Sequence, residues 1–300
     1  MSFQPTRRTG LNRTVLLSPG APWHGAPAGR ALGAASPLDD GQWLCALERL
    51  VATLVEPTPQ DRAARPDWGE DDWARWGQLE QIVLCGGVLA GGRGDLVRSR
   101  FRAPGQLGLP AVPVEVETDP ASASLRGLTA RPPVDAPTLV LDLGHTAVKA
   151  AVATEVGDLG PVTRFRVPWT PFDLGTWPDP ATLLGLVREA AAHVRSEELA
   201  VRDPAPVEAR LAVANYVVDG QLDDDPTWGT LAHLGQPAAE LLSQELGLPV
   251  RLLVNDGQAA AMGRAGQRHT AVITIGTSLG VGFPPCSAPT PQQRRSLSRD

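Results

Sequence analysis

The residues between positions 139 and 153 carry the clearest chemical signal in this sequence. Asp142 stands at the end of an apolar run, the turn Gly144-His145-Thr146 follows it, and Lys149 comes three residues later as the only lysine in a chain with 26 arginines. A carboxylate, backbone N–H groups, a hydroxyl and a compact ammonium suit a nucleotide phosphate, with Asp142 holding magnesium through bound water. The alternative is an ordinary β-hairpin turn with an incidental aspartate.

Two glycine-rich segments could bring backbone N–H groups close to the same ligand. Residues 276–282 read Gly-Thr-Ser-Leu-Gly-Val-Gly, and their glycines leave room for a phosphate beside two hydroxyls. Residues 85–87 read Cys-Gly-Gly after a short apolar run, so a base or ribose could lie against the backbone there. The alternative for each segment is a structural glycine turn. The predicted phosphate and nucleotide contacts in the two segments are Gly276, Thr277, Ser278, Gly280, Gly86 and Gly87.

Asp256 is the predicted catalytic residue. The segment "LLVNDGQAAAMG" runs from an apolar strand pattern through Asn255 and Asp256 into a small-residue helix pattern. In open α/β sheets, ligands bind at such strand-to-helix junctions. A carboxylate there can take the proton from a substrate hydroxyl as it attacks a phosphoryl group, and Asn255 can hold a neighbouring hydroxyl. Between two strands, the same Asn-Asp-Gly would indicate a turn and nothing more.

Alternating strands and helices would position these turns, which predicts an α/β protein. Apolar or alternating runs predict strands over residues 81–85, 112–117, 138–143, 148–153, 162–167, 210–214, 250–254, 271–275 and 279–283. Apolar residues at helical spacing predict helices over residues 39–56, 71–79, 181–199, 237–246 and 258–266. Asp179 and Pro180 supply an N-cap and a first-turn proline for the helix at 181–199. Gly247 ends the helix at 237–246. The proline-rich residues 128–137 predict a break between a first third and the remainder of the chain.

Three segments together resemble the ROK-type sugar kinases of the actin/hexokinase superfamily. "VLDLGHTAVKAAVA", "PVRLLVNDGQAAAMG" and "AVITIGTSLGVGF" are similar to that family's first phosphate motif, catalytic Asn-Asp segment and second phosphate motif. The resemblance implies a two-lobed, ribonuclease H-like fold and transfer of the γ-phosphoryl group of ATP to a sugar hydroxyl. It also implies ATP and Mg²⁺ as cofactors and a small sugar as substrate.

The order of the motifs implies a circular permutation. The family's adenosine segment comes last, whereas the similar stretch "WGQLEQIVLCGGVLAGGRGDLVRSRF" stands near the front of this chain. Residues 14–18 would then form the strand that pairs with residues 279–283. The expected lobes are residues 12–133 with 270–284, which would bind the nucleotide, and residues 136–268, which would carry the first phosphate motif and Asp256. Residues 1–11 and 285–300 are expected to be disordered tails.

The sugar-binding part of the family pattern is poorly reproduced. His145 stands where the family usually has a second glycine, and it could bond to a substrate oxygen or lie in a surface turn. His24 and Asn215 are the remaining candidate sugar contacts, but the family's glutamate has no counterpart beside His24. Two alternatives to a sugar kinase therefore stay open: a non-catalytic sensor that binds nucleotide or sugar, and a kinase for another small acceptor.

Composition narrows the remaining function classes. A net charge of -6 gives no electrostatic reason to expect nucleic acid or an anionic membrane as partner. The three cysteines are far apart and form no CxxC pair, so neither a zinc site nor a disulfide framework is expected. The first residues lack the apolar run of a signal peptide, and a cytoplasmic location is expected. The chain could form a homodimer, although nothing in the sequence fixes its oligomeric state.

Overall fold

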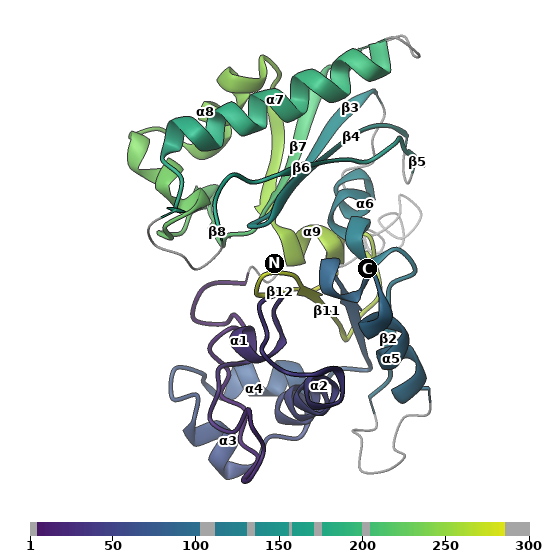
Figure 1. The fold of residues 1–300 in the computed structure, drawn as a ribbon, viewed down its shortest axis with the longest axis vertical. Helices are drawn as coiled ribbons and strands as arrows, with labels where there is room; N and C mark the ends of the chain where they lie inside the picture. Colours follow the sequence, from purple (N-terminus) through teal and green to yellow (C-terminus); the bar gives the residue numbers. More distant parts are fainter. Residues whose placement is uncertain are drawn as a thin grey trace, which may run out of the picture.

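The computed structural model describes residues 5–102, 112–130, 136–155, 158–170, 176–199 and 205–285. Two lobes, each built on its own β-sheet, lie one above the other in Figure 1, with two helices between them. These helices are α6 (Ala123–Ala130) and α9 (Asp256–Met262). The predicted α/β class and the two-lobed arrangement are confirmed.

The upper lobe contains a sheet in the order β10-β7-β3-β4-β5, with β6 also paired to β4. β3 and β4 form an antiparallel hairpin, while β7 and β10 add in parallel on the other side of β3. A hairpin extended by parallel strands in this order is the ribonuclease H-like arrangement that the resemblance implies. The strands are β3 (Thr138–Leu143), β4 (Ala147–Glu155), β5 (Asp158–Leu159), β6 (Thr163–Arg166), β7 (Glu208–Val213) and β10 (Val250–Asn255).

Two helices cover the outer face of this sheet (Figure 1), α7 (Pro180–Leu199) and α8 (Ala238–Leu246). The predicted cap of α7 is present, because the Thr182 N–H donates to Asp179 Oδ1 at 2.7 Å. Gly247 ends α8 with φ of +62°, a conformation that favours glycine. The apolar face of α7 is buried against the strands, which forms the upper core.

The lower lobe contains a sheet in the order β12-β11-β1-β2. β11 (Thr270–Ile275) pairs in parallel with β1 (Gln81–Cys85), so segments from the two ends of the chain lie side by side. β2 (Val114–Val116) and β12 (Leu279–Gly282) complete this sheet. The circular permutation and the lobe boundaries stay predictions. The helices of this lobe are α1 (Ala28–Leu32), α2 (Asp40–Val55), α3 (Pro59–Ala63), α4 (Glu70–Gly77) and α5 (Gly92–Arg100).

The predicted pairing of residues 14–18 with β12 is wrong. The Leu16 N–H donates to Ala26 O at 3.0 Å, and the Ala28 N–H donates to Thr14 O at 2.7 Å. Val15 forms a single bridge to Pro27. The backbone groups of this segment are therefore satisfied within a local loop, and among the described residues β12 is the edge of its sheet.

Two boundaries also differ from the sequence expectation. Leu11 is fully buried and Thr9 nearly so, which means that residues 5–11 pack against the protein and are no loose tail. α6 extends to Ala130, because the prolines at positions 132 and 133 follow its end and do not interrupt it. Residues 1–4 and 286–300 of the expected tails, together with Cys286, lie outside the described residues.

Close backbone contact holds α6 against α9. A Cβ at Gly127 of α6 would overlap the carbonyl group of Ala259 in α9. A Cβ at Gly257 would approach Val281 of β12 to within 2.5 Å of its nitrogen. Because side chains at these glycines would separate the elements, the small residues of the "NDGQAAAMG" segment allow Asp256 to lie at the junction of the lobes.

Candidate active site

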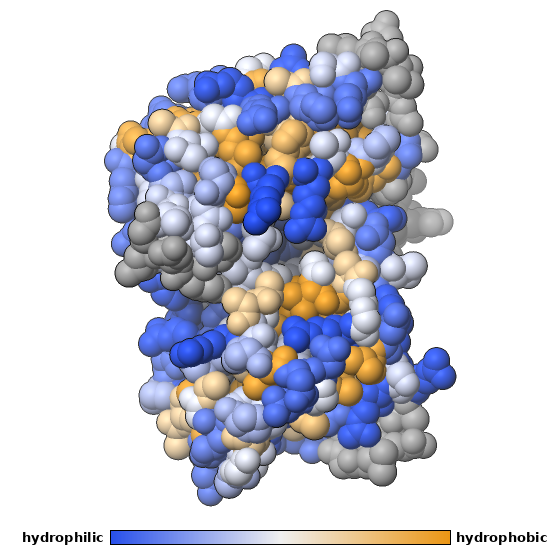
Figure 2. Space-filling view, in the orientation of Figure 1, coloured by the Kyte–Doolittle hydropathy of each residue, from blue (hydrophilic) through white to orange (hydrophobic). Residues whose placement is uncertain are grey.

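A cavity of about 770 Å³ lies between the two lobes. Figure 2 shows the surface hollowed where the upper and lower halves meet. Both lobes contribute to its wall, and it is in the size range of small-molecule sites. The sequence-predicted site residues that line it are Asp142, Gly144, His145, Thr146, Lys149, Asn215, Asn255, Asp256, Gly276, Thr277, Ser278, Gly280, Gly86 and Gly87.

His24 is the predicted site residue that the structure does not bring to this cavity. It is exposed in a turn of the lower lobe, where its Nδ1 accepts a hydrogen bond from the Ser18 N–H at 2.9 Å. The local loop that replaces the expected strand at residues 14–18 carries His24 on its outer side. The structure does not bring His24 together with the other candidate contacts, and its role as a sugar contact stays a prediction.

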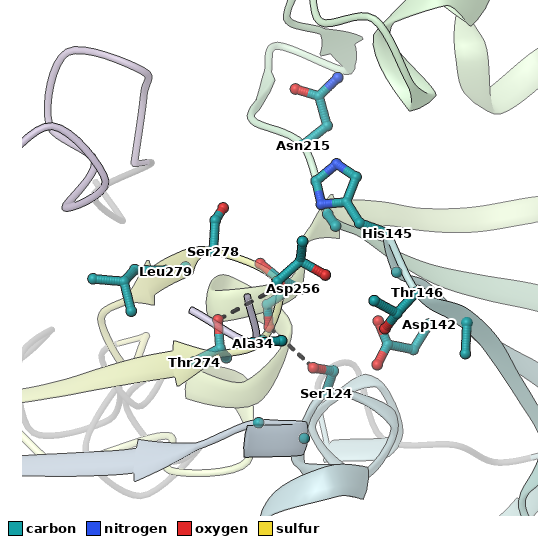
Figure 3. Close-up of a pocket in the computed structure, with 18 of the residues that line it drawn as sticks. Ala34, Ser124, Asp142, His145, Thr146, Asn215, Asp256, Thr274, Ser278 and Leu279 are labelled. Carbon is teal, nitrogen blue, oxygen red and sulfur yellow. Dashed lines mark hydrogen bonds between the residues drawn. The ribbon is translucent and has the colours of Figure 1, made fainter. Parts of the chain in front are cut away.

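Asp256 occupies the centre of the site as the first residue of α9 (Figure 3). Its Oδ1 accepts from the Gly257 N–H at 2.7 Å, and the Thr274 hydroxyl lies 3.5 Å from Oδ2. Burial raises the pKa of Asp256 to about 7, and the negative charge of Asp142 acts in the same direction against the Gly257, Lys149 and Thr274 contacts. A carboxylate with this pKa can exchange a proton near neutral pH.

Asn255 caps α9 and fixes the neighbouring loop. Its Oδ1 accepts from the Gly257 N–H at 3.0 Å, and its Nδ2 donates to Asn215 O at 3.0 Å. Asn215 in turn donates from Nδ2 to Asp223 O at 2.8 Å. Both asparagines are buried. Their amides hold the backbone around Asp256, a positioning use that the sequence does not reveal, while substrate contact by either residue stays a prediction.

Lys149 pairs with Asp142 across the β3–β4 hairpin. The two residues are register partners, and Lys149 Nζ lies 2.8 Å from Asp142 Oδ2. Burial alone would lower the pKa of Lys149, but the charge and hydrogen bond of Asp142 outweigh it and raise that pKa. Lys149 Nζ also donates to Ala121 O at 2.7 Å in the 3₁₀ helix η2 (Pro120–Ser122). The single lysine therefore neutralises Asp142 and links β4 to the segment that leads into α6.

His145 lies in a relay of polar groups at the upper wall. Its Nε2 is 3.0 Å from Thr227 Oγ1, and that hydroxyl donates to Asp225 Oδ1 at 2.6 Å. Because the Thr227 proton goes to Asp225, Nε2 of His145 is the donor and Nδ1 is left as an acceptor. Burial lowers the pKa of His145, although Asp225 opposes the shift. A neutral imidazole is the form that results at pH 7.

The turn that carries His145 is held from above. Trp228, in the 3₁₀ helix η4 (Trp228–Leu234), donates from Nε1 to Gly144 O at 3.3 Å. Thr146, two residues after Gly144 in this turn, is exposed and lines the cavity. The hydroxyl of Thr146 is therefore available to a ligand while Gly144 is fixed.

The paired glycines at the end of β1 differ in their structural need. Gly86 has φ of +105°, and a Cβ there would overlap Ile275 of β11. Only glycine fits this position. A Cβ at Gly87 would meet no atom within 4 Å, because this residue faces open space on the cavity wall. The fold requires Gly86, whereas Gly87 leaves room for a ligand.

The turn between β11 and β12 brings Gly276, Thr277 and Ser278 to the cavity from the lower lobe. Ala34 donates its N–H to Gly276 O at 2.8 Å, and the Leu279 N–H donates to Asn12 Oδ1 at 2.6 Å. Contacts from the N-terminal part of the chain thus hold a turn near its other end. Figure 3 shows Ser278 and Leu279 on one side of Asp256, with Asp142 and Thr146 on the other.

Several residues of the cavity wall are not predicted from the sequence. The single tyrosine, Tyr216, directly follows the predicted contact Asn215. Thr274 interrupts the apolar residues 271–275 of β11. Both positions are sequence signals for a site residue. Only the tertiary fold brings the remaining unpredicted residues to the cavity. The main unpredicted polar residues are Arg7, Asn12, Arg93, Ser124, Arg164, Trp177, Tyr216, Asp225, Thr227 and Thr274.

No protein-family model matches this chain, and no curated protein matches it. Solved structures that resemble it include a ROK family glucokinase from Streptomyces griseus in complex with glucose and AMPPNP, at 24% identity and a TM-score of 0.37 over 51% of this chain and 45% of that one. A ROK family protein from Streptococcus pneumoniae TIGR4 in complex with sucrose has 21% identity and a TM-score of 0.33, over 51% of this chain and 47% of that one.

The ethanolamine utilization protein EutJ from Carboxydothermus hydrogenoformans has 16% identity and a TM-score of 0.36, over 62% of this chain and 65% of that one. The chain spans less than half the length of the two ROK family structures that it matches. We therefore infer the function from the geometry of the chain's own site.

Within the described residues, no group of three or more His, Cys, Asp or Glu side chains could hold a metal ion. No helix in that part of the chain is both long and apolar enough to cross a membrane.

Proposed function

We propose that this protein transfers the γ-phosphoryl group of ATP to a hydroxyl group of a small sugar. The observation that carries the proposal is the setting of Asp256: a carboxylate with a pKa of about 7 at the first residue of α9, in a cavity that turns of both lobes line. Asp256 would act as the general base that takes the proton from the attacking hydroxyl.

The phosphates of ATP would lie between the two turns that face each other across Asp256. The turn after β3 offers the Thr146 hydroxyl, and the turn after β11 offers Thr277 and Ser278 with their backbone N–H groups. Lys149 neutralises Asp142, so this wall would not present an unpaired carboxylate to the phosphates. Backbone donors and a cation stabilise the charge that a transferring phosphoryl group spreads over its oxygens.

Asp142 fits a water-mediated contact to Mg²⁺. Lys149 occupies its Oδ2, and no hydrogen bond to its Oδ1 is present among the described residues, so one carboxylate oxygen can accept from a metal-bound water. Mg²⁺ bound with ATP keeps several waters and needs few protein ligands, which agrees with a site that has one carboxylate. When bound, the ion would neutralise charge on the phosphates. Gly86 and Gly87 would lie against the adenosine at the lower wall.

The test is acceptor-dependent production of ADP. Purified protein with Mg-ATP and a panel of monosaccharides should produce ADP with at least one sugar, and Asp256→Asn should remove that activity while the protein stays folded. Glu80→Gln is a matched control, because Glu80 is an exposed acid outside the cavity. Sugar-dependent ADP production that survives in Asp256→Asn would refute the proposal.

A non-catalytic sensor of nucleotide or sugar is the second candidate. The observation that favours it is that the candidate acceptor contacts His145, Asn215 and Asn255 each hydrogen-bond to protein groups, and that His24 lies elsewhere. Thermal stabilisation by Mg-ATP or a sugar, without turnover on any acceptor in the panel, would favour the sensor. Turnover on any acceptor would exclude it.

A further inference from the structure

Residues 5–12, here called the N-terminal strap, reach from the lower lobe to the upper lobe. Figure 1 shows an N-terminal segment, in purple, in the region between α1 and β8 (Val217–Val218). Arg7 Nε lies 2.8 Å from Asp223 Oδ2, and its Nη2 contacts Asp224 O. Both acceptors belong to the upper lobe, just after β9 (Gln221–Leu222). The strap therefore makes an ion pair across the cleft.

Tyr216 makes the second contact between the strap and the upper lobe. Its hydroxyl group lies directly over Gly10, so that a Cβ at Gly10 would overlap it. The hydroxyl also hydrogen-bonds to the side chain of Asn12. Burial and the charge of Asp256 raise the pKa of Tyr216 to about 12, so the phenol stays protonated. Asn12 in turn accepts from the Leu279 N–H at 2.6 Å, which connects Tyr216 to the turn before β12.

Arg65 anchors the strap to the lower lobe. This guanidinium is almost fully buried and donates to Arg8 O at 2.8 Å, to Gly10 O at 3.2 Å and to Thr14 Oγ1 at 2.7 Å. Each of these acceptors is a fixed point on or next to the strap. The strap is consequently held on one side by its own lobe and presents Arg7 and Asn12 to the other.

The loop that the strap contacts fixes two of the candidate acceptor contacts, Asn215 and His145. Asp223 is the residue whose carbonyl fixes Asn215, and Asp225, two positions on, orients Thr227 toward His145. Arg7, Asn12 and Tyr216 line the same cavity. Strap and loop together therefore form one wall of the cavity on the side of Asp256.

We propose that the N-terminal strap determines acceptor size: with Tyr216 and Asn12 in contact, the wall admits a monosaccharide and excludes longer acceptors. This inference depends on the proposed sugar kinase function. Arg7 and Tyr216 are positioning and specificity-determining residues in it, since they hold the loop that bears Asn215 and close the cavity beside Asp256. Opening the wall leaves the turn after β3 in place, whereas Asn12, which Tyr216 contacts, also holds the turn after β11 through the Leu279 N–H. The specificity test therefore compares two acceptors in the same variant, because an effect on phosphate binding is common to both.

Two variants open the wall by different means, and a third serves as the control. Arg7→Ala removes the ion pair across the cleft. Gly10→Ala removes no group but adds a methyl that displaces the Tyr216 hydroxyl. Arg8→Ala is the matched control, because Arg8 is as exposed as Arg7 (side chains 52% and 53%) but pairs with Asp72 of its own lobe.

The first measurement needs no enzymatic activity. Hydrogen exchange of the amides in residues 214–227 should be about three-fold faster in Arg7→Ala and about ten-fold faster in Gly10→Ala, reflecting the loss of roughly one exposed ion pair or of packed contacts. Arg8→Ala should leave these amides unchanged. Unchanged exchange in both opening variants would overturn the strap proposal without bearing on the kinase function.

The second measurement compares two probes, glucose and maltose, as acceptors. The ratio of kcat/KM for maltose to that for glucose should rise at least about five-fold in Gly10→Ala and stay at the wild-type value in Arg8→Ala. An active enzyme whose ratio does not change in Gly10→Ala overturns the strap proposal and leaves the kinase function standing. If the wild type and the variants turn over no sugar at all, both the kinase function and the acceptor-size inference fail.

Discussion

Replacement of Asp256 by asparagine should stabilise the protein at high pH. The folded-state pKa of Asp256 is raised from 3.8 to about 7, so the folded protein holds this proton more tightly than the unfolded chain does. Ionisation therefore penalises the folded state increasingly from about pH 4 to about pH 7, and the penalty is fully present above pH 7. The asparagine side chain keeps an oxygen for the Gly257 N–H and carries no charge.

The magnitude follows from the shift of about three pKa units. At 1.36 kcal/mol per unit, the free energy of unfolding of the variant should exceed that of the wild type by up to about 4 kcal/mol at pH 8. The difference should fall to near zero at pH 4, where the wild-type carboxyl group is protonated in the folded state. A gain in stability with a loss of activity is the expected behaviour for a functional group held in an unfavourable setting.

Urea unfolding of wild type and variant at pH 4 to 9 measures this difference. In thermal unfolding the same effect should raise the midpoint at pH 8 by several degrees, at about 2 °C per kcal/mol. Glu80→Gln, at an exposed acid outside the cavity, should show no pH-dependent difference of this size. The reasoning is refuted if Asp256→Asn is less stable than wild type at pH 8, or if its advantage grows toward low pH.

Three further substitutions test the supports of the site. Lys149→Met should lower the free energy of unfolding by about 3 kcal/mol, because it leaves Asp142 buried without its partner; urea unfolding should show most of this loss recovered when Asp142→Asn is added. Gly280→Ala should reduce kcat more than about 10-fold, because its Cβ would lie 2.5 Å from Asp256 Oδ1, while circular dichroism shows a folded protein. Gly127→Ala should lower stability by about 2 kcal/mol in thermal unfolding, since the methyl overlaps a backbone carbonyl of α9.

Local sequence signals predict the elements of the upper lobe closely. β3 occupies the predicted residues 138–143, and α7 begins at Pro180 after the predicted cap Asp179. Such signals are local: an alternating or helical pattern and a capping side chain act within a few residues of one another. The same logic places Asp256 at a strand-to-helix junction, where the structure has it.

Contacts that are distant in sequence explain what the sequence could not predict. The apolar run at residues 14–18 has a strand pattern, but its hydrogen bonds go to Ala26 and Ala28 nearby, and a pattern does not specify a partner. The sequence predicts Lys149 beside phosphates, whereas its direct partners are Asp142 and the Ala121 carbonyl. The strap has the polar composition of a tail, and that composition does not reveal that Arg65, far along the chain, binds it.

The most direct test of the central claim is the pH dependence of sugar-dependent ADP production. If Asp256 is the general base in the cleft, kcat of the wild type should rise about 10-fold for each pH unit below the pKa and level off above about pH 7. Asp256→Asn should lower kcat by at least about 100-fold at pH 8. A wild-type rate that is flat from pH 5 to 8, or an Asp256→Asn protein that retains wild-type kcat, would contradict the account.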